Sequence, residues 1–337
     1  MKTLEYSGNC SIHLGEKPVP EPASDQVRIK VSYAGICGTD MHIADGQHPR
    51  AKGGLVMGHE FSGTIDKAGV DTDFSVGERV VVEPLISCGS CYSCRSGYPH
   101  VCQNLGLYGI DADGAFAEYV VIASDKVYRL PDSIQMVHGA LVEPMAVGVH
   151  AIRLSNLKSL DTVLVIGGGP IGLFVAIAAK QAGADVFISE INPFRNTLLK
   201  RLGFKTFDTN SEPSVRDEIT DGKGFDVVFD AAGGPETLKI ANVNVRVKGQ
   251  VVMVAIPTQD RAVSYVPISF KEISLIGVRV YEYYDFHRAI HMLENLDMDL
   301  SLLYQVYPLE SYEEAFASAK GGDDVMRVLF DLEGADV

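Results

Sequence analysis

The stretch TVLVIGGGPIGLFVAIAAKQAG, residues 162–183, decides the fold of the second half of this chain. Its first residues form an apolar run with the length of a buried strand, and consecutive glycines follow. The next apolar run is long enough for a helix, and Gly183 is a typical helix end. A strand, a glycine turn and a helix in this order are characteristic of a parallel sheet covered by helices.

The glycine spacing in this stretch also predicts a ligand. Gly167, Gly169 and Gly172 match the pattern G-x-G-x-x-G, which is weak evidence alone because many glycine-rich turns share it. Between a strand and a helix, the first two glycines allow a close approach to a pyrophosphate, and the third allows close helix packing. The helix N-terminus favours the anion. The predicted dinucleotide contacts are Gly167, Gly169, Pro170, Ile171 and Gly172.

An acidic residue ends the next predicted strand, residues 185–190. Glu190 is expected to accept hydrogen bonds from a ribose diol, and its charge repels a 2′-phosphate, so NAD is predicted rather than NADP. Arg195 keeps the alternative open, because an arginine can hold that phosphate; we interpret it as flanking the adenine. The structural alternative for Glu190 is a solvated strand end.

The two halves of the chain differ in their patterns. From residue 161 onward strands alternate with helices, and further apolar runs at 225–233, 250–256 and 273–280 predict more parallel strands. A helix at 285–296 and a last strand at 325–332 follow, and that strand is a candidate for return to the first domain. The first half is β-rich and predicts a compact, barrel-like domain, with strands at 26–36, 62–69, 78–84 and 115–122.

Four of the six cysteines lie within residues 88–102. In a reducing compartment such a cluster is a poor disulfide candidate, and metal is the better account. Four thiolates around a turning loop are typical of a closed structural zinc site, and an iron–sulfur cluster is the alternative that spacing leaves open. The predicted ligands are Cys88, Cys91, Cys94 and Cys102.

A second set of candidate ligands combines sulfur, nitrogen and oxygen. Cys37 follows a predicted strand, His59 and Glu60 lie in GHEFSG, and Glu143 interrupts an apolar run. A buried carboxylate is costly unless it is paired or bound to metal. Each residue alone has an ordinary structural interpretation. Together with a dinucleotide fold, they indicate a catalytic zinc with an open coordination position.

The bulk composition limits the other possibilities. The chain has 337 residues, 46% of them hydrophobic and 22% charged, as expected for about two globular domains. A net charge of −15 argues against nucleic acid and anionic membranes as partners. No apolar run is long enough to span a bilayer, and the first residues do not resemble a signal peptide. We therefore expect a cytoplasmic protein.

The motifs GICGTDMH, GHEFSG, VEPMAVGVHA and VLVIGGGPIGL, with the four-cysteine lobe between them, occur in the order seen in zinc-dependent medium-chain dehydrogenases. The chain resembles the sorbitol, butanediol and sugar-acid dehydrogenase branch of that family over nearly its whole length. The resemblance implies an α/β protein with a GroES-like, β-rich catalytic domain at 1–150, completed by 281–337. It also implies a doubly wound, NAD-binding Rossmann domain at 151–280.

The resemblance also implies roles for single residues. Cys37, His59 and Glu60 are assigned to a catalytic zinc, with Glu143 either as a fourth ligand or as the holder of a zinc-bound water. Thr39 would accept the substrate proton, and His42 is a candidate later station. The cysteine lobe would hold a second, structural zinc. The remaining cofactor-facing positions are predicted at Val254, Ile256, Val278 and Arg279.

These assignments predict an enzyme that transfers a hydride from a secondary alcohol to NAD+ and leaves a ketone. The expected substrate is a polyol, cyclitol, sugar acid or vicinal diol, and the expected assembly is a homo-oligomer, a tetramer or dimer. L-threonine 3-dehydrogenase shares the motifs and is the rival within the enzyme class. A catalytically silent binding or structural protein on the same scaffold is the rival from another class.

Overall fold

The computed structural model describes residues 1–209, 213–257, 259–260, 262–322 and 324–334. The chain divides into two compact units. The first unit combines Met1–Glu143 with Glu282–Val337, and the second unit is Pro144–Tyr281. The first division therefore falls at Glu143, near the start of a helix, rather than near residue 150. Each unit is described by itself.

The second unit is built around one six-stranded parallel sheet. Its strands are β11 (Thr162–Ile166), β12 (Asp185–Ser189), β13 (Lys205–Phe207), β14 (Phe225–Asp230), β15 (Val245–Met253) and β16 (Ser274–Gly277). Its helices are α4 (Val142–Leu154), which begins at the boundary, α5 (Pro170–Gln181), α6 (Pro193–Arg201), α7 (Pro213–Thr220), α8 (Thr237–Asn244) and α9 (Tyr265–Lys271).

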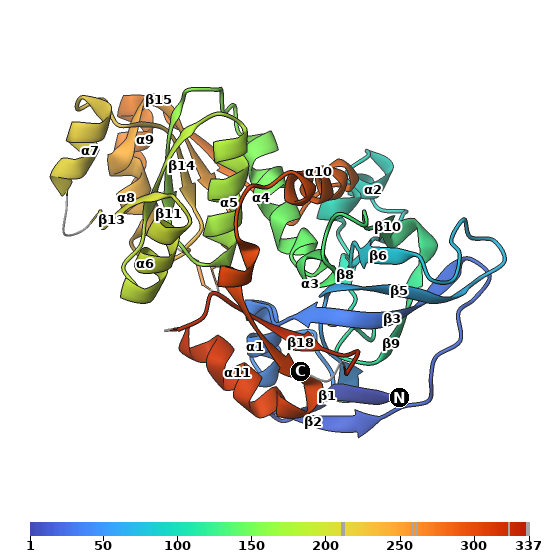
Figure 1. Cartoon of the computed structure of the whole chain (residues 1–337). Helices are drawn as coiled ribbons and strands as arrows, with labels where there is room; N and C mark the ends of the chain where they lie inside the picture. The colour runs from blue at the N-terminus through green and yellow to red at the C-terminus, as the bar shows by residue number, and fades with distance from the viewer. Residues whose placement is uncertain (210–212, 258, 261, 323, 335–337) are drawn as a thin grey trace. The chain divides into compact units, whose positions relative to one another are not determined.

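The order of the strands identifies the architecture of this sheet. The order is β13-β12-β11-β14-β15-β16, the doubly wound arrangement in which the first strand lies near the middle and the direction of winding reverses beside it. Helices α5 and α6 lie on one side of the sheet, and α8 and α9 on the other (Figure 1). The central strands β11 and β14 are almost entirely buried, which explains their continuous apolar sequences.

The first unit is mostly antiparallel sheet. Its strands are β1 (Lys2–Gly8), β2 (Ser11–Glu16), β3 (Gln26–Gly35), β4 (Leu55–Val56), β5 (Glu60–Ala68), β6 (Arg79–Val82), β7 (Leu85–Ile86), β8 (Gly106–Leu107), β9 (Tyr119–Ala123), β10 (Val127–Arg129), β17 (Tyr304–Pro308) and β18 (Arg327–Asp331). Its helices are α1 (Gly38–Ala44), α2 (Tyr92–Arg95), α3 (Met136–Gly139), α10 (Tyr283–Glu294) and α11 (Tyr312–Gly321). Short 3₁₀ turns lie at Pro99–Val101, Ser124–Lys126, Leu300–Leu303 and Leu309–Ser311.

Strand β3 organises the first unit. It pairs antiparallel with β5, β9 and β18, so the sheet runs β10-β6-β5-β3-β18-β17 with β9 attached to β3. The predicted return of the last strand to the first domain is confirmed, because β18 from the C-terminal segment lies beside β3 (Figure 1). Strand β3 from the first half of the chain and β18 from its C-terminal segment thus share one sheet, and both segments contribute to one apolar core.

Each unit has its own hydrophobic core. Phe116 and Phe330 meet edge to face in the first unit with their ring centroids 5.0 Å apart. Phe187 and Phe225 pack in the second unit. In the described parts of the chain, no helix combines the length and the apolar character needed to cross a membrane.

Candidate active site and metal centres

Cys37 lies between the end of β3 and the start of α1, where it forms the N-cap of the helix. Asp40 closes this turn, because its Oδ2 atom accepts a hydrogen bond of 2.8 Å from the backbone N–H of Cys37. The thiol is thus held at a helix N-terminus by a local capping interaction. Burial raises the pKa of Cys37 to about 11, and the charges of Asp40 and Glu143 act in the same direction.

His59 and Glu60 lie at the bend that leads into β5. Gly58 before them has a φ of +91°, and a side chain there would collide with the ring of Phe116, so this position requires glycine. Glu60 is the first residue of the strand and His59 lies just outside it. The bend therefore removes the alternation that would send two neighbouring strand side chains to opposite faces.

Cys37, His59 and Glu60 converge in the first unit. Each offers one ligand atom, and these atoms lie within 4.8 Å of one another. His59 and Glu60 are buried. A set of one half-buried thiol, one buried imidazole and one buried carboxylate is a donor set that suits zinc, because all three ligand types bind this ion in proteins. The geometry of this chain thus fits a metal at the predicted place.

Asp40 is a site residue that the sequence analysis did not identify. Its Oδ1 atom lies 3.8 Å from Nδ1 of His59, and neither atom has a hydrogen-bond partner among the described residues. A carboxylate on the Nδ1 side leaves Nε2 of the imidazole for a metal ion, the arrangement common for histidine ligands. The available signal was the spacing between Cys37 and Asp40, which is that of a helix cap.

Glu60 forms a buried ion pair with Arg327, which lies on β18. Strand β3 lies between β5 and β18. Its residue Gly35 pairs with Glu60 on one side and with Leu329 on the other. A Cβ atom at Gly35 would lie 2.6 Å from Oε2 of Glu60 and 2.9 Å from Nη2 of Arg327. Glycine at this position therefore leaves the space in which the pair meets. Arg327 was also missed, although it is a charged residue in an apolar strand.

Glu143 does not belong to the group of three converging ligand atoms. It lies in the first turn of α4, is only partly buried, and its charge contributes to the raised pKa of Cys37. Its role, as a direct ligand or as the holder of a zinc-bound water, stays a prediction.

Thr39 and His42 both lie on α1, three residues apart and therefore on the same face of the helix. Thr39 Oγ1 is 3.8 Å from the sulfur of Cys37. His42 is exposed, and its Nδ1 atom lies 3.2 Å from Oε1 of Gln47. The helix thus leads from the half-buried cysteine to a histidine at the surface.

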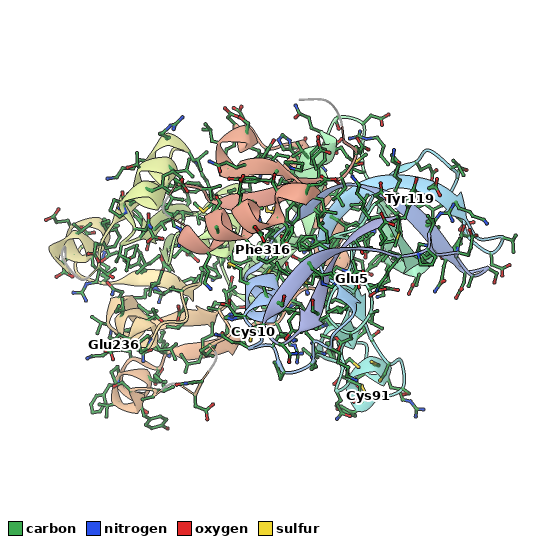
Figure 2. All side chains as sticks on the ribbon, turned by 90° about the horizontal axis from the view of Figure 1, so that it is seen from below. Glu5, Cys10, Cys91, Tyr119, Glu236 and Phe316 are labelled. Carbon is green, nitrogen blue, oxygen red and sulfur yellow. The ribbon has the colours of Figure 1, made fainter. Side chains whose placement is uncertain are left out.

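The four predicted thiols of the cysteine lobe, residues 88–102, come together as a group whose ligand atoms lie within 4.8 Å of one another. The lobe projects from the first unit and carries Cys91 (Figure 2). The sulfur of Cys91 is 3.5 Å from that of Cys94 and 3.8 Å from that of Cys102. These separations exceed a disulfide bond and match the ~3.8 Å between ligands of a tetrahedral zinc with Zn–S bonds of about 2.3 Å.

Backbone N–H groups in this lobe stabilise the thiolate form of some of its cysteines. The N–H groups of Cys88 and Asn104 each donate to the sulfur of Cys102 over 3.3 Å. Hydrogen bonds from backbone amides lower the pKa of Cys88 to about 5 and also lower that of Cys91. Desolvation and the neighbouring thiols raise the pKa of Cys94 to about 12. A cation at the centre of the four sulfurs would offset this last effect.

The second unit contains a pocket of about 440 Å³ at the glycine turn. Gly167 has a φ of +91°, and a side chain at Gly172 would collide with the carbonyl oxygen of Gly167. Helix α5 begins at Pro170 directly behind this turn. The predicted turn and close helix approach are therefore both present. The lining includes Gly167, Gly169, Pro170, Ile171, Glu190 and Arg195, and also Thr209, Ala231, Ala232 and Thr237, which the sequence analysis did not name.

Glu190 lies just after β12 and is buried. Its Oε2 atom accepts a hydrogen bond of 2.8 Å from the N–H of Gly168, and its Oε1 atom accepts one of 2.7 Å from the N–H of Asn192. The carboxylate is thus fixed against the glycine turn. Arg195 on α6 lines the same pocket, and its Nε atom is buried without a hydrogen-bond partner among the described residues.

The four remaining predicted cofactor positions lie at the carboxyl ends of two neighbouring strands, which is the edge of the sheet that carries the glycine turn. Val254 and Ile256 follow β15, and Val278 and Arg279 follow β16. Val254 and Val278 are buried, whereas Ile256 and Arg279 are exposed. None of the four is among the residues that line the described pocket. Their predicted contacts with the cofactor therefore have no support from its lining.

Comparison with known proteins identifies the class. Residues 23–132 match the family described as alcohol dehydrogenase GroES-like domain, and residues 170–295 match the family described as zinc-binding dehydrogenase. The 2-dehydro-3-deoxy-L-galactonate 5-dehydrogenase of Pseudoalteromonas atlantica is 38% identical over 98% of both chains. The sorbitol dehydrogenase of Halalkalibacterium halodurans is 33% identical over 99% of both chains. The L-threonine 3-dehydrogenase of Pyrococcus abyssi is 34% identical over 96% of this chain and 95% of its own.

Solved structures agree with this result. The 2R,3R-butanediol dehydrogenase of Bacillus subtilis superposes with a TM-score of 0.90 at 29% identity and covers 98% of this chain and 99% of its own. A dehydrogenase of Escherichia coli CFT073 with bound NADH has the same fold, with a TM-score of 0.91 at 28% identity over 98% of this chain and 99% of its own. A zinc-binding dehydrogenase of Sinorhizobium meliloti with bound NADP also has it, with a TM-score of 0.88 at 29% identity over 98% of both chains.

This chain belongs to the zinc-binding alcohol dehydrogenase family. The predicted fold class, a GroES-like domain with a Rossmann domain, is confirmed, and so is the prediction of an enzyme rather than a silent binding protein. It is an oxidoreductase of the medium-chain class that uses zinc and a nicotinamide cofactor to oxidise alcohols.

Proposed function

We propose that this enzyme oxidises a secondary alcohol of a polyol, cyclitol, sugar acid or vicinal diol to a ketone, with NAD+ as the acceptor. The observation that carries the proposal is the convergence of Cys37, His59 and Glu60 within 4.8 Å. The relatives named for sugar-acid, sorbitol and butanediol substrates support the substrate class.

We infer that Cys37, His59 and Glu60 hold the catalytic zinc. A zinc ion in such a set supplies Lewis acidity, which favours loss of a proton from a hydroxyl group. Asp40 orients His59 through its Nδ1 side. Glu60 has Arg327 as its buried partner, so its charge is balanced whether or not it contacts the ion. Glu143 serves either as a fourth ligand or as the holder of a zinc-bound water.

The proton from the substrate hydroxyl requires a route to solvent. Thr39 is proposed as the first acceptor, because its hydroxyl lies beside Cys37. His42, one helical turn later and exposed, is proposed as the station from which the proton leaves. An imidazole suits this role because one of its ring nitrogens can accept a proton while the other donates one.

A second zinc is proposed in the cysteine lobe, with Cys88, Cys91, Cys94 and Cys102 as its ligands, which makes two zinc ions per chain. The sulfur separations of 3.5 and 3.8 Å support this proposal. Because all four positions of a tetrahedral site are then filled by protein, the ion stabilises the lobe and has no place for substrate. An iron–sulfur cluster is the alternative that metal analysis would reveal.

NAD is proposed as the preferred cofactor. The buried Glu190 carboxylate at the edge of the pocket supports this choice, because it places negative charge where a 2′-phosphate of NADP would bind. Arg195 lines the same pocket, and a relative of known structure binds NADP, so the test includes both cofactors.

A homo-oligomer, a dimer or tetramer, is also proposed. Helix α9 and strand β16 in the second unit support it, since Tyr265 and Phe270 on α9 are 75% and 85% exposed and Leu275 on β16 is also exposed. Strand β16 is the last strand of its sheet in the described part of the chain. An open strand edge beside exposed aromatic side chains is typical of a surface that another chain covers. A cytoplasmic location stays a prediction.

The test of the proposed function is reduction of NAD+ and NADP+, followed by absorbance, across a panel of polyols, aldonates, vicinal diols and L-threonine. We expect turnover with a polyhydroxy compound and NAD+. Turnover with L-threonine alone would favour the L-threonine 3-dehydrogenase alternative, which relatives of about one-third identity also support. Measurement of zinc on the same sample connects activity to metal content.

A further inference from the structure

The loop between α1 and β4, residues 45–54, is held in place at two points. His42 on α1 interacts with Gln47 at 3.2 Å. Arg50 donates to the carbonyl oxygen of Leu105 over 2.6 Å, and its guanidinium lies 3.0 Å from a carboxylate oxygen of Asp111. The loop is therefore tied both to the helix that follows Cys37 and to the segment after the cysteine lobe.

The contacts of Arg50 have a consequence for substrate binding. A cation in this loop would be the natural partner of an acidic substrate, but Arg50 already has a carboxylate and a carbonyl as partners. Asp111 is itself fixed, because it accepts a hydrogen bond of 2.9 Å from the N–H of Leu107. The arginine thus supports the loop. His48, two residues before it, is the next candidate in this loop for a contact with substrate.

The tautomer of His48 is set by the backbone. The N–H of Arg50 donates to Nδ1 of His48 over 3.4 Å, so Nδ1 is an acceptor and the neutral ring carries its hydrogen on Nε2. Burial lowers the pKa of His48, and the charge of Arg50 lowers it further, so the ring is neutral at pH 7. Among the residues described, none accepts a hydrogen bond from its Nε2 atom.

His48 also lies near the residues assigned to catalysis. It directly follows Gln47, whose Oε1 atom lies 3.2 Å from Nδ1 of His42, the proposed proton station, and its imidazole is half-buried. A fixed N–H donor beside the contact of this loop with the proposed proton station is suited to bind an oxygen of the molecule that the metal site receives.

We propose that His48 donates a hydrogen bond from Nε2 to a second oxygen of the substrate, one that is not on the reacting carbon. His48 thereby selects polyhydroxy compounds over simple secondary alcohols. This inference rests on the proposed function and names the residue that distinguishes its substrates. His48 acts on specificity, whereas the bond changes at the reacting carbon belong to the site around Cys37.

The test compares two matched pairs of substrates, butane-2,3-diol with butan-2-ol and sorbitol with hexan-2-ol, in NAD+ reduction. His48→Phe keeps an aromatic ring but removes the donor. We expect kcat/KM for the accepted polyhydroxy compound to fall about three- to tenfold, the effect of one lost neutral hydrogen bond, while kcat/KM for the simple alcohol stays within about twofold. His48→Gln, which restores an N–H donor, should recover most of the loss.

Lys52→Ala is the matched control, because Lys52 is an exposed residue of the same loop, and both substrates should be unaffected. An equal fall for both members of a pair would overturn the role of His48 but leave the proposed function intact. A wild-type enzyme without preference for the polyhydroxy member would also overturn it. Absence of dehydrogenase activity with all alcohols of the panel would instead overturn the proposed function.

Discussion

Gly35 shows how much a single position contributes to this site. Strand β3 separates Glu60 from Arg327, and only the absence of a side chain at Gly35 lets the two charges meet. We expect Gly35→Ala to displace the pair, to lower the free energy of unfolding by about 1–3 kcal/mol, the usual cost of overpacking, and to reduce activity. Gly321→Ala is the control, since a Cβ atom there meets nothing within 4 Å. Thermal unfolding of both variants gives the comparison, and equal midpoints would contradict the account.

Cys37 is the residue at which the catalytic assignment is most directly tested. Cys37→Ala should reduce kcat/KM more than about 100-fold. Mutation of a residue that only hydrogen-bonds to a metal ligand already costs about 10–100-fold in metal affinity or activity, and loss of the ligand itself should cost more. The variant should retain NADH binding and the zinc of the cysteine lobe. Cys10→Ala, an exposed thiol outside both ligand sets, should retain activity and both ions. Native mass spectrometry and fluorescence titration with NADH provide the measurements. An active Cys37→Ala enzyme would remove Cys37 from the catalytic site.

Glu190 determines the cofactor prediction. In Glu190→Ala the glycine turn loses the carboxylate that accepts from Gly168, and the pocket loses its negative charge. We expect NAD+ to bind more weakly and the preference over NADP+ to narrow, because the repulsion of a 2′-phosphate is removed. Arg195→Ala is the companion variant and should weaken NADP+ more than NAD+. Equal turnover of both cofactors by the wild-type enzyme would contradict the assignment of Glu190 as the residue that selects NAD+. It would instead indicate that Arg195 binds the 2′-phosphate of NADP+.

At the scale of elements, the features that were predicted correctly are those that depend on residues close together in the sequence. The strand, glycine turn and helix at 162–183 were predicted within a few residues, because apolar runs and glycine conformations act locally. The spacing of the four cysteines likewise predicted one cluster. Asp40 and Arg327 were not predicted. Arg327 reaches Glu60 only through the pairing of β18 with β3, which joins the two ends of the chain. The grouping of Cys37 with His59 was predicted from their ligand types together with the dinucleotide fold, and the family resemblance then assigned their roles, because nothing in their spacing along the chain shows that they meet.

The cysteine lobe should behave as a separate structural element. A closed zinc site contributes folding free energy directly, so Cys91→Ala should lose one zinc ion and make the lobe sensitive to proteolysis. Helix α2 within the lobe contains no buried residue, so it contributes little apolar packing. Activity of the remaining folded enzyme should fall less than in Cys37→Ala. A stable, metal-replete but inactive Cys91→Ala enzyme would make the thiol cluster the reactive centre instead.

At the scale of the whole molecule, the exposed surface of the second unit predicts assembly. Helix α9 has no fully buried residue, although its sequence is largely apolar. We expect Phe270→Asp to shift the wild-type oligomer toward smaller species, because an unpaired charge in a buried interface is costly. Val70→Asp is the control, since Val70 is a 91% exposed side chain in a turn of the first unit. Light scattering after gel filtration measures the mass. A wild-type enzyme that is monomeric at micromolar concentration would contradict the proposed homo-oligomer. An oligomer that Phe270→Asp leaves unchanged would show that the interface does not involve Phe270.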